Sequence, residues 1–203
     1  MVLMARAKSQ SDFGLFDVPA SLPEGFVYRP NFVSEREEKA LIKEIQKLTL
    51  IAFKYYQFTG KRRTASFGWQ YEFGSDDITR APDLPEFLLP LRERAGKLFK
   101  VDVDSLVQAS IVEYPVGAPI GWHRDIPQFG TIVGVSLAGA CRMRLREYRH
   151  PRSKVSRRGQ AVSIELEPRS IYLMSGPSRQ LWQHSIPPVK ELRYSVIMRT
   201  LRS

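Results

Sequence analysis

The spacing of apolar and polar residues along the chain predicts helices early and strands late. Ser34 and Glu37 have the spacing of a capping box, and apolar residues follow at helical intervals, so we expect a helix over residues 35–48. A second helical pattern covers residues 84–100, where Pro90 is placed to kink the helix or to delay its start. Beyond this second helix the period shortens to that of strands and stays there.

Six short segments of the second half have the composition and alternation of β-strands. They are Ala109–Tyr114, Thr131–Ala138, Cys141–Tyr148, Ala161–Leu166, Ser170–Met174 and Leu192–Thr200. Helices followed by many short antiparallel strands predict an α+β fold that is mainly β. We expect a double-stranded β-helix (jelly roll) core with two N-terminal helices packed on its outside.

The segment between the two predicted helices is rich in aromatic and basic residues. Residues 60–63 (GKRR) predict a basic turn between two strands. Beyond it, Phe67, Trp69, Tyr71 and Phe73 occupy alternate positions, which in one strand would place their rings on one face. Such a face either packs on the core or contributes walls to a substrate pocket.

Length and composition are those of a globular protein with one domain. The chain has 203 residues, of which 43% are hydrophobic and 26% charged. We expect a loose tail over residues 1–15 and a single domain over 16–203, with helices and substrate-side strands in 16–104 and the jelly-roll core in 105–203. Cys141 is the single cysteine, which excludes an internal disulfide and a four-cysteine zinc site.

No apolar run approaches the roughly 20 residues of a membrane span, and the first residues lack the apolar core of a signal peptide. We therefore expect no membrane partner and a cytoplasmic protein, or a nuclear one in a eukaryote. We also expect a monomer.

Positive charge is concentrated in one part of the chain. The formal net charge is +10, and residues 141–160 contribute +7 of it, from seven arginines and one lysine against one glutamate. Arg142 and Arg144 alternate with apolar residues, which predicts a half-buried strand with a basic outer face. This strand, with a loop over 149–158, either follows nucleic-acid phosphates or is a solvated surface.

The second half also contains a pattern typical of a metal site. His123 and Asp125 are two residues apart, so in an extended segment their side chains point the same way. His184, in the same strand-rich region, completes a set of two imidazoles and one carboxylate. Such a set leaves positions on a ferrous ion open for a co-substrate and dioxygen. The alternative is that His123 caps a turn and His184 is an ordinary buried polar residue.

The last predicted strand carries two arginines on one face. Arg193, Ser195 and Arg199 share that face, and inward guanidinium groups are costly unless each meets an anion. A dicarboxylate such as 2-oxoglutarate would supply one carboxylate to each arginine. Because six residues of strand span about 20 Å, the alternative is that one arginine pairs with a carboxylate of the protein.

Several short motifs of the second half follow one another in an order known from one enzyme family. They are Tyr114-Pro115-Val116-Gly117, His123-Arg124-Asp125, Gly176-Pro177-Ser178-Arg179 before His184, Ile186-Pro187-Pro188 and Arg193-Tyr194-Ser195-Val196-Ile197-Met198-Arg199. In these motifs, over nearly half of its length, the chain resembles the AlkB-like dioxygenases, which use Fe(II), 2-oxoglutarate and dioxygen.

The resemblance implies a role for each matching residue. The implied iron ligands are His123, Asp125 and His184. Arg193 would pair with the distal carboxylate of 2-oxoglutarate, Tyr114 would hydrogen-bond the same co-substrate, and Arg199 would lie near the carboxylate that chelates the metal. Family members often have asparagine where this chain has Val112 and Ser195. We therefore expect the hydrogen-bond shell of the co-substrate, to which Ser195 belongs, to differ here.

The resemblance also implies the chemistry and a class of substrate. The family oxidises a substrate C–H bond while 2-oxoglutarate becomes succinate and carbon dioxide, and an oxidised N-methyl group leaves as formaldehyde. The implied substrate is an N-alkylated base of DNA or RNA, flipped out and stacked on an aromatic ring. The residues expected to contact it are Trp69, Tyr71, Trp122, Arg62, Arg63, Arg142 and Arg144. The alternatives are the same chemistry on a protein side chain and a jelly-roll binding module without catalysis.

Overall fold

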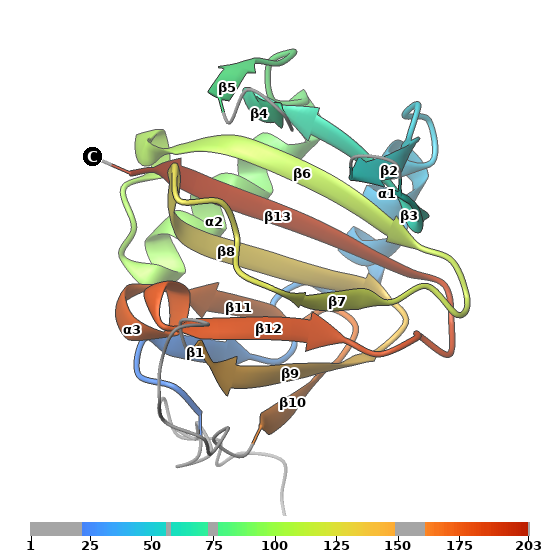
Figure 1. Cartoon of the computed structure of the whole chain (residues 1–203). Coiled ribbons are helices and arrows are strands. Elements are labelled where there is room, and N and C mark those ends of the chain that lie inside the picture. The colour runs from blue at the N-terminus through green and yellow to red at the C-terminus, as the bar shows by residue number, and fades with distance from the viewer. Residues whose placement is uncertain (1–21, 56–57, 73–76, 149–160, 203) are drawn as a thin grey trace, which may run out of the picture.

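The described residues form two facing antiparallel sheets and a separate small hairpin, as a computed structural model shows (Figure 1). The structure describes residues 22–55, 58–72, 77–148 and 161–202. The predicted tail, the basic loop over 149–158 and Phe73 lie outside these ranges. The predicted fold class, mainly β with a jelly-roll core, is confirmed.

The larger sheet has seven strands and the smaller has four. The larger runs in the order β1 (Phe26–Arg29), β11 (Ile171–Met174), β8 (Phe129–Ala138), β13 (Arg193–Leu201), β6 (Leu106–Tyr114), β3 (Phe58–Phe67) and β2 (Ile51–Tyr55). The smaller runs β10 (Val162–Leu166), β9 (Cys141–Glu147), β12 (Trp182–Ile186) and β7 (Ile120–His123). The hairpin joins β4 (Trp69–Glu72) to β5 (Asp77–Arg80).

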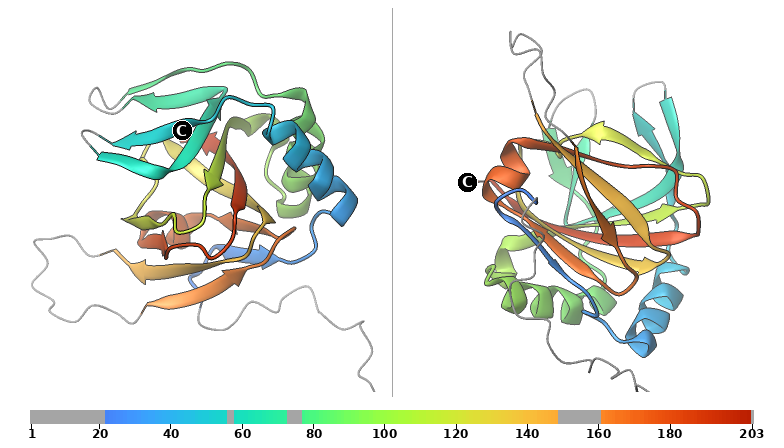
Figure 2. Two further views of the ribbon diagram at one scale, coloured as in Figure 1. Left: turned by 90° about the vertical axis from the view of Figure 1, so that its right-hand side faces the viewer. Right: turned by 90° about the horizontal axis from the view of Figure 1, so that it is seen from below.

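Two helices, α1 (Glu35–Ile45) and α2 (Leu89–Phe99), cover the face of the larger sheet that is turned away from the smaller one (Figure 2). The predicted capping box is present at the start of α1, where Ser34 and Glu37 bond reciprocally. Pro90 lies in the first turn of α2, where its missing N–H costs nothing, and the short turn η1 (Glu86–Leu88) precedes it. No described helix is long and apolar enough to cross a membrane.

Two apolar clusters hold these layers together. The first fills the space between the helices and the larger sheet, around Ile45, Leu91 and Val196. The second lies between the two sheets and includes Met143, Leu145 and Tyr172. The polar residues of the predicted site are placed in this second layer, so their charges are surrounded by apolar walls.

Two predictions for the segment before α2 are wrong. The basic stretch 60–63 is not a turn, because it lies inside β3, where Arg63 pairs with Glu113 of β6 and their side chains form two hydrogen bonds. The aromatic residues do not share one strand, because Gly68 separates β3 from β4. Gly68 has φ +73°, and a Cβ there would lie 2.0 Å from the carbonyl oxygen of Val107.

Glu38 ties α1 to the sheet beneath it. Its buried carboxylate accepts hydrogen bonds from the backbone N–H of Ala138 at 2.9 Å and from the Arg169 guanidinium at 3.1 Å. Ala138 and Arg169 both have positive φ angles of 66°, so the carboxylate stabilises two backbone turns that are unfavourable for these residue types.

We predict that Glu38→Ala lowers the free energy of unfolding by about 1–3 kcal/mol, because two partly buried donors lose their buried acceptor. The measurement is urea denaturation followed by circular dichroism. Lys39→Ala, on the exposed face of the same helix, is the control and should change the midpoint little. Equal effects of the two substitutions would contradict this role of Glu38.

Candidate metal centre and cavity

A cavity of about 1000 Å³ lies between the two sheets. Its walls come from β2, β3, β6, β8, β11 and β13 of the larger sheet, from β7, β9 and β12 of the smaller one, and from β4 of the hairpin. The residues of the predicted site that line it are Tyr114, His123, Asp125, His184, Arg193, Ser195 and Arg199. The fold therefore brings together side chains that are up to 85 positions apart (Tyr114 to Arg199).

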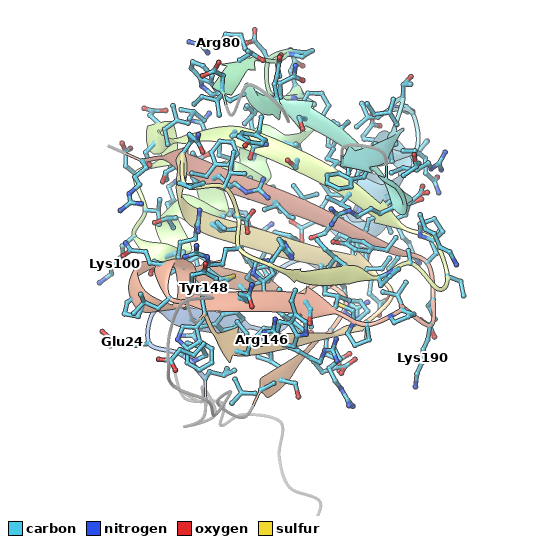
Figure 3. All side chains as sticks on the ribbon, in the orientation of Figure 1. Glu24, Arg80, Lys100, Arg146, Tyr148 and Lys190 are labelled. Carbon is cyan, nitrogen blue, oxygen red and sulfur yellow. The ribbon has the colours of Figure 1, made fainter. Side chains whose placement is uncertain are left out.

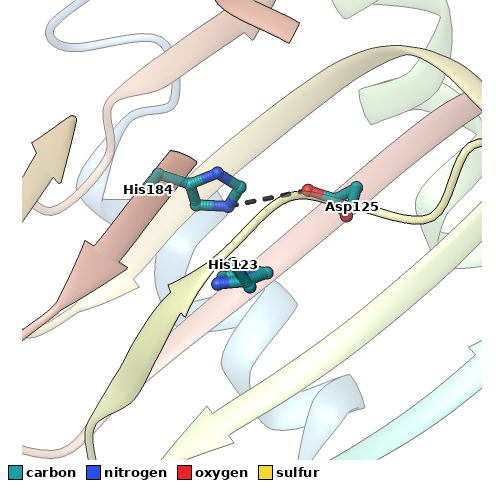
Figure 4. A group of neighbouring side chains, drawn as sticks. All are labelled: His123, Asp125 and His184. Carbon is teal, nitrogen blue, oxygen red and sulfur yellow. Dashed lines mark ion pairs between the residues drawn. The ribbon is translucent and has the colours of Figure 1, made fainter. Parts of the chain in front are cut away.

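The two histidines face each other across neighbouring strands (Figure 4). His123 of β7 is the direct partner of His184 of β12, and a directly opposite pair in an antiparallel sheet projects to the same side. Their ring centroids are 4.2 Å apart and the rings are tilted by 54°. Nδ1 of His123 lies 2.9 Å from the carbonyl oxygen of Gly121, which can only accept, so Nδ1 carries the proton and Nε2 is the nitrogen free to bind a metal.

Asp125 completes the group from the loop that follows β7. Its Oδ2 lies 3.5 Å from Nε2 of His184, and one ligand atom from each of the three residues lies within 4.8 Å of the others. Its Oδ1 is occupied, because it accepts hydrogen bonds from Nε and Nη2 of Arg199 at 3.1 and 2.8 Å. Oδ2 is therefore the oxygen available to a metal ion.

The protonation states suit metal binding. Burial lowers the pKa of His184 to about 3, and burial also lowers the pKa of His123, so both imidazoles are neutral at ordinary pH. Burial alone would raise the pKa of Asp125, but the Arg199 guanidinium and the other neighbouring groups together outweigh it and hold that pKa well below its usual range. The group thus presents two neutral imidazoles and one carboxylate, the forms in which these side chains bind metals.

The two arginines of β13 are used differently. Arg199 has protein partners on all three nitrogens, since Nη1 donates to Gln108 at 2.8 Å and to Ser110 at 3.1 Å. The alternative raised by the sequence, an arginine paired with a protein carboxylate, therefore holds for Arg199. Its expected place near the metal-chelating carboxylate of the co-substrate stays a prediction, since its guanidinium is held beside the metal group by Asp125.

Arg193 is buried without a counterion among the described residues. It is 1% exposed, its guanidinium lies 5.0 Å from the ring centroid of Tyr114, and its Nε donates to the Ser136 hydroxyl at 3.1 Å. Its Nη1 is buried and makes no hydrogen bond within the described part of the chain. A buried cationic donor of this kind fits a carboxylate ligand, which would complete its hydrogen bonds.

Arg179, from the short helix α3 (Gly176–Gln180), holds the loop that carries Asp125. Its guanidinium donates to three backbone carbonyls, those of Ile126, Phe129 and Gly130, at 2.7, 2.7 and 3.0 Å. The side chain is buried, and the first of these carbonyls directly follows Asp125, whereas the other two belong to the start of β8. Arg179 thereby joins the loop after Asp125 to the start of β8.

Some of the residues predicted to contact the substrate line the cavity, and others do not. Tyr71, Trp122 and Arg62 line the cavity, and the Arg62 guanidinium lies 3.9 Å from the ring centroid of Phe53. Trp69 does not line it, since its ring packs against Arg80 on the β4–β5 hairpin at 4.3 Å. Alternation along β3 explains why Arg62 lines the cavity while its neighbour Arg63 does not.

Three of the predicted basic residues lie outside the cavity. Arg63 lies on the other face of the larger sheet, where it holds Glu113. Arg142 and Arg144 are on the outer face of β9, away from the cavity, because the inner face of that strand carries Met143 and Leu145. They cannot contact a group inside the cavity.

Residues 25–202 match the family described as the 2OG-Fe(II) oxygenase superfamily. The chain belongs to this superfamily. Fe(II), 2-oxoglutarate and dioxygen are accordingly its cofactor and co-substrates, and the His-Asp-His group is a fitting site for the iron.

Similar proteins place the oxygenase among the AlkB-like members. It is 30% identical to the alkylated DNA repair protein ALKBH8 homolog of Arabidopsis thaliana over 93% of this chain and 58% of that protein. It is 28% identical to the tRNA (carboxymethyluridine(34)-5-O)-methyltransferase ALKBH8 of Mus musculus, over 84% of this chain and 25% of that protein. The chain thus spans only part of the length of these curated relatives.

Solved structures share the fold of the oxygenase. The structure of OsALKBH1 matches with a TM-score of 0.67 at 14% identity, over 88% of this chain and 98% of that one. A prolyl-4-hydroxylase of Pseudomonas putida matches with a TM-score of 0.59 at 12% identity, over 88% of this chain and 93% of that one. At these identities the likeness concerns the fold.

Sequence reasoning missed several residues of the site. Gln108 and Ser110, which accept hydrogen bonds from Arg199, are separated from Tyr114 by an even number of positions along β6. Their side chains therefore lie on the same face of that strand as Tyr114, and this alternation could have identified them from the sequence. Arg179 belongs to the motif Gly176-Pro177-Ser178-Arg179, on which the resemblance to the AlkB-like dioxygenases partly rests, but it was assigned no role in the site from the sequence. Tyr172 stands in an apolar strand and carried no signal beyond its residue type.

We predict that Arg199→Gln weakens divalent metal binding about 10- to 100-fold, because Asp125 loses the group that ionises and orients it. The measurement is titration with Mn²⁺ followed by electron paramagnetic resonance. Arg202→Gln, at an exposed position beyond the end of β13, is the control. Unchanged affinity in Arg199→Gln would show that the ion pair serves stability alone.

Proposed function

We propose that this oxygenase removes an alkyl group from a nitrogen atom of a nucleobase, with His123, Asp125 and His184 as the iron ligands. When bound, iron and 2-oxoglutarate supply the oxidising power for the substrate C–H bond. The residues of the chain hold and orient the reactants. The group of three leaves one side of the iron site open toward the cavity, and Arg193 with Tyr114 and Ser195 provides the polar end for the co-substrate.

The cavity supports a planar substrate bound beside the metal group. Its volume of about 1000 Å³ exceeds the needs of a five-carbon dicarboxylate alone, and Tyr71 and Phe53 offer aromatic surface within it. Arg62 and Lys61 add positive charge to the same wall. An aromatic surface next to positive charge suits a stacked base with its phosphate.

The observation that carries the nucleic-acid proposal is an arginine–aromatic face on the outside of the smaller sheet, which comprises Trp122, Arg124, Arg144, Arg146 and Tyr148. The Arg144 and Arg146 guanidinium groups lie 5.1 and 4.3 Å from the Trp122 ring centroid. The Arg124 guanidinium lies 3.7 Å from that of Tyr148. Figure 3 shows Arg146 and Tyr148 on this side of the molecule.

This arginine–aromatic face is continuous with the cavity. Trp122 and Arg124 also line the cavity, because they belong to β7 and its end, which form the edge of the smaller sheet. A chain of nucleotides that crosses this edge would leave phosphates on the outer arginines and one base inside. The names of the relatives, which concern alkylated DNA and tRNA, support the same class of substrate.

We predict that the iron-loaded protein demethylates an N-methylated oligonucleotide, with succinate and formaldehyde released in equal amounts. The experiment presents a set of methylated DNA and RNA oligonucleotides and reads their masses. His123→Ala should abolish the mass change, because it removes an iron ligand. If all oligonucleotides remain unchanged while a peptide set is hydroxylated, the nucleic-acid proposal is wrong and the side-chain alternative takes its place.

We further predict that the double substitution Arg144→Gln and Arg146→Gln flattens the salt dependence of oligonucleotide affinity. Each lost phosphate contact on a single strand lowers the slope of log K against log salt by about 0.7. Fluorescence anisotropy over a series of salt concentrations measures the slope. Arg36→Gln with Lys39→Gln, which removes the same charge from the exposed face of α1, is the matched control. If the two double variants behave alike, the arginine–aromatic face does not bind phosphates.

A further inference from the structure

The cavity contains a tyrosine hydroxyl that the roles assigned so far do not use. Tyr172 of β11 lines the cavity and is 4% exposed. Its hydroxyl makes no hydrogen bond with any described residue, although buried tyrosine hydroxyls nearly always have a partner. A donor of a buried residue that opens onto a binding cavity and has no partner among the described residues points to a ligand as its partner.

Gly134 directs this hydroxyl toward the strand that carries the arginines. Tyr172 pairs with Gly134 of β8, and Gly134 pairs on its other side with Ile197 of β13. A Cβ on Gly134 would lie 2.3 Å from the ring carbons of Tyr172 and 2.5 Å from its hydroxyl oxygen. The ring therefore lies across β8 with its hydroxyl above Gly134, and it reaches from β11 toward β13.

Tyr172 stays protonated in this position. Burial raises the pKa of Tyr172 far above its usual value, although the positive charge of Arg193 opposes the shift. A neutral phenol can donate a hydrogen bond to an anion, and the Arg193 guanidinium, which lines the same cavity, acts electrostatically on this hydroxyl. Two donors from different strands, one charged and one neutral, thus converge on one region of the cavity.

We propose that Tyr172 binds 2-oxoglutarate by donating a hydrogen bond to the carboxylate that Arg193 holds. This inference rests on the co-substrate site proposed above. It assigns part of the hydrogen-bond shell to β11, on the side of the cavity opposite Val112 and Tyr114 of β6 in the strand order. Val112 has no polar side chain and the Ser195 hydroxyl is short, so the Tyr172 phenol supplies a donor that these two positions do not.

Packing alone does not require the hydroxyl. The Tyr172 ring stacks on Phe26 with centroids 5.8 Å apart and an interplanar angle of 3°. A phenylalanine at position 172 would keep this contact and would still fit over Gly134. Tyr172→Phe therefore removes the proposed hydrogen bond and leaves the packing, which makes it the decisive substitution.

The experiment is calorimetric titration of the Mn²⁺-loaded whole chain with 2-oxoglutarate, in which no turnover occurs. Tyr172→Phe should raise the dissociation constant of 2-oxoglutarate about 10-fold or more, because a hydrogen bond to a charged group is lost. The affinity for Mn²⁺ should stay within about twofold of the unmodified protein. Tyr28→Phe, which removes a hydroxyl from the paired residue on β1, is the matched control and should leave both affinities unchanged.

A reference variant, Arg193→Gln, separates failure of this inference from failure of the co-substrate site. If Arg193→Gln weakens 2-oxoglutarate binding and Tyr172→Phe does not, the hydroxyl has no role in binding and the inference is wrong. If neither substitution weakens binding, the co-substrate is held elsewhere, and the site proposed above is wrong as well. A loss of 2-oxoglutarate affinity in Tyr28→Phe equal to that in Tyr172→Phe would assign the effect to packing between β1 and β11.

Discussion

The ion pair between Asp125 and Arg199 is the interaction on which the site depends. An ionised carboxylate between two apolar sheets is costly unless a cation and further hydrogen bonds accompany it. Arg199 provides both, since it holds one oxygen of Asp125 and is itself held by Gln108 and Ser110 of β6. The second oxygen is left facing His184. The central strand β13 thereby determines which atom of a loop residue is offered to the metal.

The same strand carries the contrasting arginine. Arg193 lies at its other end, where the surrounding groups are hydroxyls and an aromatic ring, and one of its nitrogens lacks a partner. Arg199 is thus paired with a carboxylate of the protein, whereas Arg193 has a nitrogen that is available to the carboxylate of a ligand. The cavity therefore has a metal-binding end and a carboxylate-binding end. This difference sets the orientation of the proposed co-substrate, with one carboxylate at Arg193 and the other end toward the metal group. The spacing of the two arginines in the sequence does not reveal it.

The sequence predicted the fold class, the capping box of α1, six strands and the three candidate ligands, because each depends on local periodicity or residue type. It did not predict β7 and β12 as strands, although they carry His123 and His184. Both are short, and neither shows a clear alternation of apolar and polar residues. The sequence did not predict the partner of Arg199 or the sheet face on which Arg63 lies. Both depend on the register between strands that are distant in the chain, and the sequence of one strand does not determine that register.

Side chains alternate between the two faces of β7, and this alternation connects the proposed metal centre with the proposed nucleic-acid surface. His123 projects into the cavity, whereas the ring of Trp122 lies against the outer arginines Arg144 and Arg146. Because β7 is an edge strand, no further strand separates the inner face from the outer one at this point. A nucleic acid that stacks on the outer face therefore needs to cross a single strand to place one base beside the metal group. The geometry of this edge, more than the total positive charge, is therefore the feature of the structure that supports the proposed nucleic-acid substrate.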